Sequence, residues 1–279
     1  MSDIRIGISG WNYAPWRGVF FPKNLPQDRE LEYASRQFRT IEINGSFYSL
    51  QAPASYMKWY SSTPGDFIFA VKANRYITHV QRLKEAARPI ANFFASGILA
   101  LKEKLGPILW QFPPNMRFDP ERFEAFVRLL PQDTQAAARM AENRDPWMRG
   151  RSLVETDRKR SLRHAIEVRH ESFRNPRFSR LLKRHKIAWV VSHSSNAWPY
   201  FEEVTADFVY VRLHGEGALY SGGYGSRALD RWAKKARDWA AGKCGRDVFV
   251  YFDNDAKVRA PFDAQLLEKR LEAEGRLAA

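Results

Sequence analysis

The sequence holds a single cysteine, Cys244, among its 279 residues. One thiol excludes an internal disulfide and a metal site built from cysteines. No apolar run approaches the roughly 18 residues that a membrane-spanning helix needs. The first residues, MSDIRIGIS, lack the basic-then-apolar order of a signal peptide. Together these absences predict a soluble, cytoplasmic protein with no membrane partner.

Acidic residues are also few: 31 Asp and Glu stand against 45 Lys and Arg, which gives a net charge of +14. Such a surplus favours anionic partners, single-stranded nucleic acid among them, although a basic surface kept for solubility explains it equally well. The remaining composition, 44% hydrophobic and 14% aromatic, is typical of a globular chain with a large core.

Short apolar runs rich in Val, Ile and aromatic residues recur along the chain, each followed by a polar loop and a helical pattern. Eight are found: 4–9, 40–44, 67–72, 107–112, 165–169, 187–192, 208–214 and 248–253. Buried parallel strands have this composition. Eight strand–helix units predict an α/β fold, a TIM-type (β/α)8 barrel forming a single domain over residues 1–279. An open doubly wound sheet is the alternative.

Helix signals lie between these runs. Asp119 and Pro120 form a helix opening, and Ser226 is expected to cap a helix that Gly242 ends. Residues 89–104 and 176–186 read as further helices. A basic insertion at about 132–164, between the fourth and fifth strands, fits either a mobile arm or an ordered helical excursion.

Barrel enzymes carry their chemistry at the carboxyl ends of the strands. The polar residues there supply four candidate catalytic groups: Glu42, Lys72, Glu167 and His214. Either glutamate could act as general acid or base, the lysine could hold an anion or form a Schiff base, and the histidine could shuttle a proton. A buried salt-bridge network, such as Glu42–Lys72 or Glu167–Arg212, is the structural alternative.

A second set of polar and aromatic residues on the same rim is expected to bind the substrate. It comprises Trp11, Tyr13, Asn44, Tyr48, Gln111, Arg169, Arg212, Tyr224 and Asn254. Arginines beside aromatic rings suit an anionic ligand with flat or sugar-like faces. In the aromatic stretch from Gly10 to Pro22, Trp16, Phe20 and Phe21 are instead expected to pack in a turn between prolines.

A divalent metal is possible but not favoured. Glu42, Glu167, His193, His214 and Asp253 could supply ligands. No HExxH or comparable spacing occurs, and the interleaved Lys and Arg would repel a cation. His79 is expected to be a hydrogen-bonding loop residue. No metal and no organic cofactor is therefore predicted, while the glycine-rich stretch HGEGALYSGGYGS (214–226) is either a phosphate cradle or a flexible lid.

Seven segments, in order, resemble the YecE-like family, also known as domain of unknown function 72. They are GISGWNYAPWRGVFFP, TIEINGSFY, FIFAVKANRYITH, GPILWQFPP, AIEVRHESF, FVYVRLHG and VFVYFDND. The resemblance spans nearly the whole chain and implies a TIM-type barrel. That barrel is similar to those of endonuclease IV and xylose isomerase, which implies a phosphodiester or sugar substrate. The clustered metal ligands of those enzymes do not occur here.

Three functions follow from these features. The first is an enzyme of hydrolase or lyase type, acting by general acid–base chemistry on a phosphate-bearing sugar, nucleotide or nucleic acid at the barrel mouth. The second is a non-catalytic nucleic-acid-binding protein that uses its basic surface and aromatic rim. The third is a carbohydrate or metabolite sensor that relies on the aromatic rim alone.

Overall fold

The computed structural model describes residues 2–242 and 245–273, so Cys244 and the inferences drawn from it lie outside the described residues. Contacts divide the chain into two compact units, residues 1–42 with 188–279, and residues 43–187. Each unit is described by itself below, and the predicted single domain over 1–279 stays a prediction. Within the described ranges, no helix combines the length and apolarity needed to cross a membrane.

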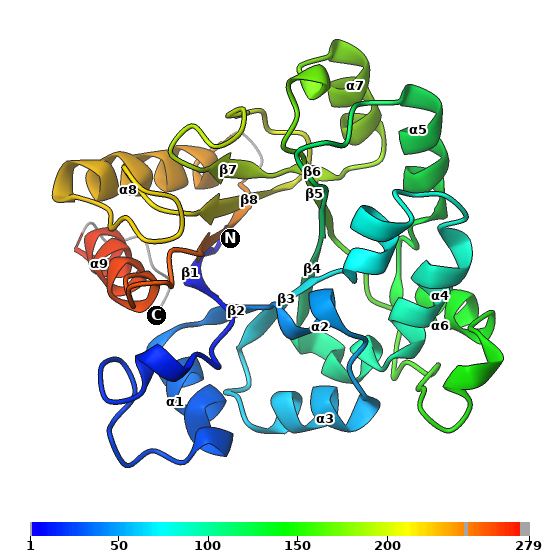
Figure 1. Ribbon diagram of the computed structural model, residues 1–279, viewed down its shortest axis with the longest axis horizontal. Coiled ribbons are helices and arrows are strands. Elements are labelled where there is room, and N and C mark those ends of the chain that lie inside the picture. Colours follow the sequence, from blue (N-terminus) through cyan, green and yellow to red (C-terminus); the bar gives the residue numbers. More distant parts are fainter. Residues whose placement is uncertain (1, 243–244, 274–279) are drawn as a thin grey trace. The chain divides into compact units, whose positions relative to one another are not determined.

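The fold is that of a TIM-type barrel, which confirms the predicted class: parallel strands alternate along the chain with helices (Figure 1). Each strand is short, largely buried and rich in Val, Ile and aromatic residues, as the eight apolar runs predict. The sixth run is corrected. It is divided into two strands on either side of Val190, Ala188–Trp189 (β6) and Val191–His193 (β7).

The unit formed by residues 1–42 and 188–279 carries six of the strands. They are β1 (Ile4–Ser9), β2 (Thr40–Ile43, whose last residue opens the other unit), β6, β7, β8 (Phe208–Leu213) and β9 (Asp247–Phe252). Its helices are α1 (Glu30–Gln37), α8 (Ser226–Ala240) and α9 (Ala260–Glu272), with 3-10 turns at Ala14–Trp16 and Gln27–Arg29. Five strands neighbour one another in the order β2-β1-β9-β8-β7, and α9 packs against α8 and β1 (Figure 1).

The register of β1 on β2 depends on a glycine. Gly7 lies opposite Thr40, and a Cβ at Gly7 would come within 2.0 Å of the Thr40 carbonyl oxygen. The absence of a side chain therefore lets the two strands approach and places Ser9 opposite Glu42. The loop after β1 packs as predicted, because Trp16, at the end of its 3-10 turn, is fully buried against Phe20 and Phe21.

Residues 43–187 hold three parallel strands in the order β3 (Ile68–Lys72), β4 (Leu105–Gln111) and β5 (His164–Glu167). The α-helices are α2 (Gly45–Tyr48), α3 (Pro53–Ser61), α4 (Ala87–Ala95), α5 (Pro120–Leu129), α6 (Thr134–Glu142) and α7 (Pro176–Arg184). Shorter turns are a π-helix at Tyr76–Val80 and 3-10 turns at Ile98–Lys104, Pro146–Met148 and Glu171–Phe173.

Helix boundaries test the cap predictions. Asp119 caps α5 as expected, since its carboxylate accepts from the Arg122 backbone N–H at 3.1 Å. Ser226 is not the cap of α8: Gly225 takes that position and Ser226 is the first helical residue. The helix expected over 89–104 is interrupted at Gly97, whose φ of +106° is a left-handed value that helical geometry forbids.

The basic insertion predicted at about 132–164 contains ordered structure. It holds α6, which packs against α4, and the 3-10 turn Pro146–Met148. Arg88 of α4 ties the two together by donating to the carbonyls of Asn143 and Arg144. Most of the segment outside these two elements is irregular, and the choice between a mobile arm and a helical excursion stays a prediction.

Candidate functional site

A buried carboxylate lies at the carboxyl ends of β1 and β2. The Ser9 hydroxyl donates to Glu42 Oε1 at 2.6 Å, and the Tyr210 hydroxyl donates to Oε2 at 2.6 Å. Glu42 is fully buried, so it needs such donors to retain its charge. Burial, together with the charge of Glu42, raises the pKa of Tyr210 well above its ordinary value, which keeps that hydroxyl protonated as a donor.

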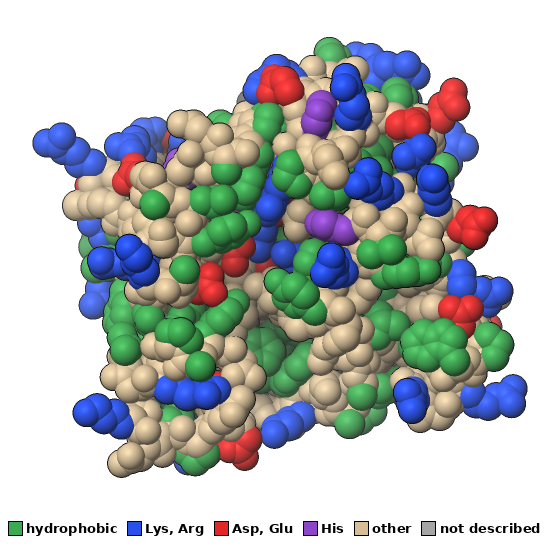
Figure 2. All heavy atoms as spheres, viewed as in Figure 1, with side chains coloured by type: hydrophobic (Ala, Val, Ile, Leu, Met, Phe, Trp, Pro, Cys, Tyr) green, Lys and Arg blue, Asp and Glu red, His purple; other side chains and the backbone are tan. Residues whose placement is uncertain are grey.

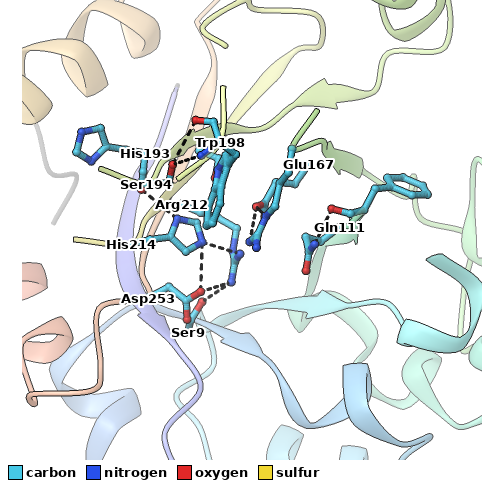
Figure 3. Close-up of polar contacts among 12 residues, drawn as sticks. Ser9, Gln111, Glu167, His193, Ser194, Trp198, Arg212, His214 and Asp253 are labelled. Carbon is cyan, nitrogen blue, oxygen red and sulfur yellow. Dashed lines mark hydrogen bonds and ion pairs between the residues drawn. The ribbon is translucent and has the colours of Figure 1, made fainter. Parts of the chain in front are cut away.

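Arg212, from β8, connects this carboxylate to a second one. Its Nε donates to Glu42 Oε2 at 3.1 Å, and its Nη2 donates to Glu42 Oε1 at 2.9 Å. The same Nη2 donates to Asp253 Oδ2 at 2.8 Å (Figure 3). The guanidinium is fully buried, with two carboxylates as counter-charges. Its predicted contact with a substrate stays a prediction; in this structure Arg212 positions Asp253 and His214. We call Ser9, Glu42, Tyr210, Arg212, His214 and Asp253 the arginine cluster.

The hydrogen bonds of His214 fix its tautomer. Its Nε2 lies 3.0 Å from Arg212 Nη1, and its Nδ1 lies 3.1 Å from the His193 carbonyl oxygen. A guanidinium can only donate, so Nε2 accepts and Nδ1 carries the proton. Asp253 Oδ2 is 3.3 Å from the same Nε2, and its side chain is 14% exposed. The predicted role of His214 as a proton shuttle stays a prediction.

Asp255 follows two residues later and is a second, half-buried carboxyl. Burial, and then the charge of Asp253, raise its pKa from 3.8 to about 6. A carboxyl whose pKa is raised in this way lies nearer the pH range in which general acids and bases work. The sequence analysis noted Asp253 only as a metal alternative and missed Asp255. Their spacing in the segment FDND, directly after a strand, is the signal that could have identified both.

The glycine-rich loop 214–226 is folded by its own hydrogen bonds. The Tyr224 hydroxyl accepts from the Gly215 N–H at 3.2 Å and lies 2.8 Å from His193 Nδ1. Asn254 donates through Nδ2 to the Gly222 carbonyl at 2.9 Å and to Asp263 at 2.8 Å, while its Oδ1 is buried without a partner. Tyr224 and Asn254 thus both stabilise the loop through hydrogen bonds. The substrate contacts and the phosphate cradle expected here stay predictions.

A separate group of candidates lies within residues 43–187. Lys72, at the end of β3, has its Nζ 4.2 Å from the centroid of the Phe47 ring, a cation–π contact. The same ring lies 5.1 Å from the His79 imidazole. The loop carrying Phe47 is fixed to the strand end, because the Ser46 hydroxyl donates to the Lys72 carbonyl at 2.7 Å.

Parallel pairing of β4 with β5 places Gln111 opposite Glu167. Glu167 is fully buried and its Oε1 accepts from Arg169 at 2.7 Å, while Gln111 donates through Nε2 to the Phe112 carbonyl at 2.7 Å (Figure 3). The ion pair within one strand end holds the guanidinium in place. We call Phe47, Lys72, His79, Gln111, Glu167 and Arg169 the lysine cluster.

The environment of this cluster lowers the pKa of His79. Burial, and then the positive charges of Lys72, Arg169 and Arg75, lower the pKa of His79 from 6.5 to about 4, with Glu167 acting in the opposite direction. Its Nδ1 lies 2.8 Å from the Thr78 hydroxyl. Its Nε2 lies 3.4 Å from the amino group of Gln111, which donates, so Nε2 accepts and the imidazole is neutral. The sequence analysis had assigned it only a loop hydrogen bond.

Besides Tyr224 and Asn254, four predicted residues lie outside these clusters. The Tyr13 hydroxyl donates to the Ser9 carbonyl at 2.7 Å, and Trp11 is half-buried in the same loop. Asn44 has a buried Oδ1 with no hydrogen-bond partner, and Tyr48 is 70% exposed. Each is described only within its own unit. Their contact with a substrate stays a prediction.

A search of residues 2–242 and 245–273 finds no group of three His, Cys, Asp or Glu side chains placed to hold a metal ion. The five possible metal ligands proposed from sequence instead pair with arginines or with hydroxyl groups where contacts are described, as Glu42, Glu167 and Asp253 pair with arginines.

Comparison with known proteins identifies the family. The sequence profile of the family described as "Protein of unknown function DUF72" matches residues 5–278. The chain belongs to the DUF72 family. This confirms the resemblance drawn from the seven segments.

Curated DUF72 relatives match over part of their length. UPF0759 protein YunF of Bacillus subtilis (strain 168) is 32% identical over 116 residues, 40% of each chain. UPF0759 protein YecE of Escherichia coli (strain K12) is 25% identical over 127 residues, 46% of this chain and 43% of its own. The matched region therefore spans less than half the length of these relatives.

Solved DUF72 structures match over almost the whole chain. A DUF72 family protein of Thermotoga maritima superposes with a TM-score of 0.73 at 25% identity, over 97% of this chain and 99% of the other. A DUF72 family protein of Enterococcus faecalis gives a TM-score of 0.70 at 19% identity, over 96% and 95%. These two DUF72 proteins therefore share the fold of this chain. The site described above is derived from the residues of this chain.

Proposed function

We propose that this DUF72 protein is an enzyme that binds the phosphate group of its substrate at the lysine cluster and acts by general acid–base chemistry. The observation that carries the proposal is the arrangement of Lys72 and Arg169 at the carboxyl ends of β3 and β5, around a half-buried imidazole. Barrel enzymes place their substrates at this end of the strands. The cations outnumber the one carboxylate, Glu167, that acts on His79.

Phosphate suits these groups chemically. Arg169 is held by Glu167, so its planar guanidinium is oriented before a ligand arrives. A fixed guanidinium and a nearby ammonium together match a phosphate dianion, the first through directed N–H groups and the second as a point charge. Both charges are largely shielded from water, which strengthens their attraction for an anion.

Substrate binding would also favour the protonated form of His79. Burial and then nearby positive charges lower the pKa of His79 to about 4; a bound dianion offsets the positive charges, so the pKa rises. The imidazole then gains a proton when substrate is present and can donate it to a leaving oxygen. Glu167 was predicted as an acid–base group, and in this proposal it also positions Arg169.

The first test is an NMR titration of the His79 imidazole, with and without inorganic phosphate. We expect phosphate to raise the pKa of His79, and Lys72→Met to weaken phosphate binding. Lys58→Met, on the exposed side of α3, is the matched control and should bind as wild type does. A His79 pKa that phosphate leaves unchanged, with Lys72→Met binding phosphate normally, would refute the proposal.

Product analysis follows with phosphomonoesters and nucleotides. Glu167→Gln should abolish turnover while leaving the fold intact by circular dichroism, and retained activity would show that the assignment of Glu167 is wrong. The analysis of products decides between hydrolysis and elimination.

The net charge of +14 supports a second candidate, non-catalytic binding of single-stranded nucleic acid. Lys and Arg side chains are spread around the edges of the face in Figure 2. The binding constant for labelled single-stranded RNA, measured by fluorescence anisotropy, should then fall steeply with salt. Its logarithm should fall with the logarithm of the salt concentration, with a slope of about −0.7 per neutralised phosphate. Tight RNA binding that Lys72→Met leaves unchanged, without turnover of any phosphate ester, would favour this candidate over the enzyme.

A further inference from the structure

A pocket of about 350 Å³ opens within residues 43–187. Its wall includes three large rings, Tyr48, Tyr76 and Trp147, which are 70%, 47% and 60% exposed. Hydrophobic side chains reach the surface in the region of α4 and α6 in Figure 2. Single exposed rings are common on protein surfaces, whereas several exposed rings around one pocket are typical of a ligand-binding site.

The polar part of the pocket comes from Asn92 and Asp145. Asn92 Nδ2 donates to Asp145 Oδ2 at 2.6 Å, and the Asp145 backbone N–H donates to Asn92 Oδ1 at 2.8 Å. The amide is therefore satisfied on both sides by one residue. Asp145 Oδ1 lies 3.7 Å from Arg88 Nε, beyond hydrogen-bond distance, and its side chain is 33% exposed. This oxygen keeps its capacity to accept hydrogen bonds from a ligand.

These groups select the kind of ligand. Asn74 is also satisfied internally, since it donates to the Ser46 carbonyl and accepts from the Tyr76 N–H. The pocket therefore combines one strong acceptor, the Asp145 carboxylate, with flat aromatic faces and with hydroxyl and indole N–H groups that can donate. A ligand rich in hydroxyl donors fits this balance. A nucleobase carries acceptors as well, which would face a carboxylate, and a phosphate would be repelled by it.

The pocket wall and the lysine cluster contact one common side chain, Phe47. The Phe47 ring lies 5.1 Å from the ring of Tyr48, which lines the pocket, and 4.2 Å from the Lys72 ammonium. His79, on the π-helix that also carries Tyr76 and Ile77 of the pocket wall, contacts the same ring. A ligand with a ring in the pocket therefore has a positively charged neighbour one aromatic side chain away.

We propose that this pocket binds the ring of a sugar whose phosphate group lies at the lysine cluster, so that the substrate class is a sugar phosphate. The phosphate half rests on the function proposed above, whereas the sugar half rests on the pocket alone. Its volume is at the small end of the range for ligand sites, about 300–1,000 Å³, which suits one or two sugar rings. The segment predicted as a basic insertion thus contributes Asp145 and Trp147 to a binding site.

Calorimetric titrations of the full chain test the two halves separately. The probes are glucose 6-phosphate, AMP, inorganic phosphate and the neutral sugar maltose, applied to wild type, Trp147→Ala and Lys72→Met. We expect Trp147→Ala to weaken glucose 6-phosphate binding roughly tenfold, as loss of a stacking ring does, and to leave inorganic phosphate binding unchanged. Lys72→Met should weaken both phosphate compounds.

Controls keep the outcome interpretable. Phe262→Ala removes a ring that is 40% exposed on α9 and should bind every probe as wild type does. Tyr48→Ala repeats the test on a second, more exposed ring. Unchanged glucose 6-phosphate binding by both Trp147→Ala and Tyr48→Ala would overturn the sugar pocket while leaving the phosphate proposal intact. Maltose binding that Trp147→Ala abolishes, without binding of inorganic phosphate, would support the pocket and refute the phosphate proposal. AMP binding tighter than glucose 6-phosphate, and lost in Trp147→Ala, would also overturn the sugar assignment.

Discussion

Replacing Arg212 by methionine is expected to destabilise the protein strongly. The substitution keeps much of the side-chain length but removes the charge that two carboxylates share, Glu42 at 2.9 Å and Asp253 at 2.8 Å. Asp253 is partly exposed and can be solvated. Glu42 is fully buried and would retain only hydroxyl donors, those of Ser9 and Tyr210.

The magnitude follows from that burial. Removing one partner of a buried ion pair costs about 3–5 kcal/mol, because the other charge is left uncompensated. Since domains are stable by only about 5–15 kcal/mol, the loss would be a large fraction of the total. Adding Glu42→Gln should restore part of it, as the uncompensated charge is then gone, with a coupling free energy of about 2 kcal/mol between the two sites.

Urea unfolding followed by circular dichroism and tryptophan fluorescence measures these free energies. Arg231→Met is the control: its ion pair with Glu216, at 3.2 Å, is on the surface, and its arginine side chain is 64% exposed. Loss of such a pair should cost less than about 1 kcal/mol. A cost for Arg212→Met no greater than that of Arg231→Met, or a double variant less stable than the single one, would refute the reasoning.

Two further predictions concern residues 43–187. Burial lowers the pKa of His164 to about 4, and its ring accepts from Trp110 Nε1 at 3.1 Å, so the folded state holds it neutral while the unfolded state takes up a proton below about 6.5. The free energy of unfolding, measured by urea titration, should therefore decrease by about 3 kcal/mol as the pH falls from 6.5 to 4, and His164→Gln should flatten that slope. Equal slopes would contradict the assignment. Gly97→Ala should lower the unfolding free energy by roughly 2–3 kcal/mol, because its φ is +106° and a Cβ would lie 2.6 Å from Pro53 Cα; a thermal melt unchanged from wild type would show that the backbone adapts.

The sequence alone determined the class of fold and the end of the strands at which to look for chemistry. Short runs such as 4–9 and 208–214 are recognised as strands, because Ile and Val alternate in them with other residues and turn or helix signals follow each run. Local chemistry also determined the start of α5, since Asp119 needs only its own neighbours to cap the helix. The prediction that Ser226 caps α8 was wrong by one residue, because Gly225 occupies the cap position. Period and capping are local properties, so the sequence carries them directly.

Only the tertiary structure decided which charges meet. The alternation of side chains suggested a salt bridge between Glu42 and Lys72 as the structural alternative to a catalytic role. Instead the register of β1, β2, β8 and β9 brings it to Arg212, more than 160 residues away along the chain. His79 could not be recognised from sequence, because its lowered pKa depends first on burial and then on cations, of which Lys72 and Arg169 come from two other segments. The pocket of Tyr48, Asp145 and Trp147 joins loops separated by about a hundred residues. Such contacts depend on how the chain packs, and no single stretch of sequence contains them.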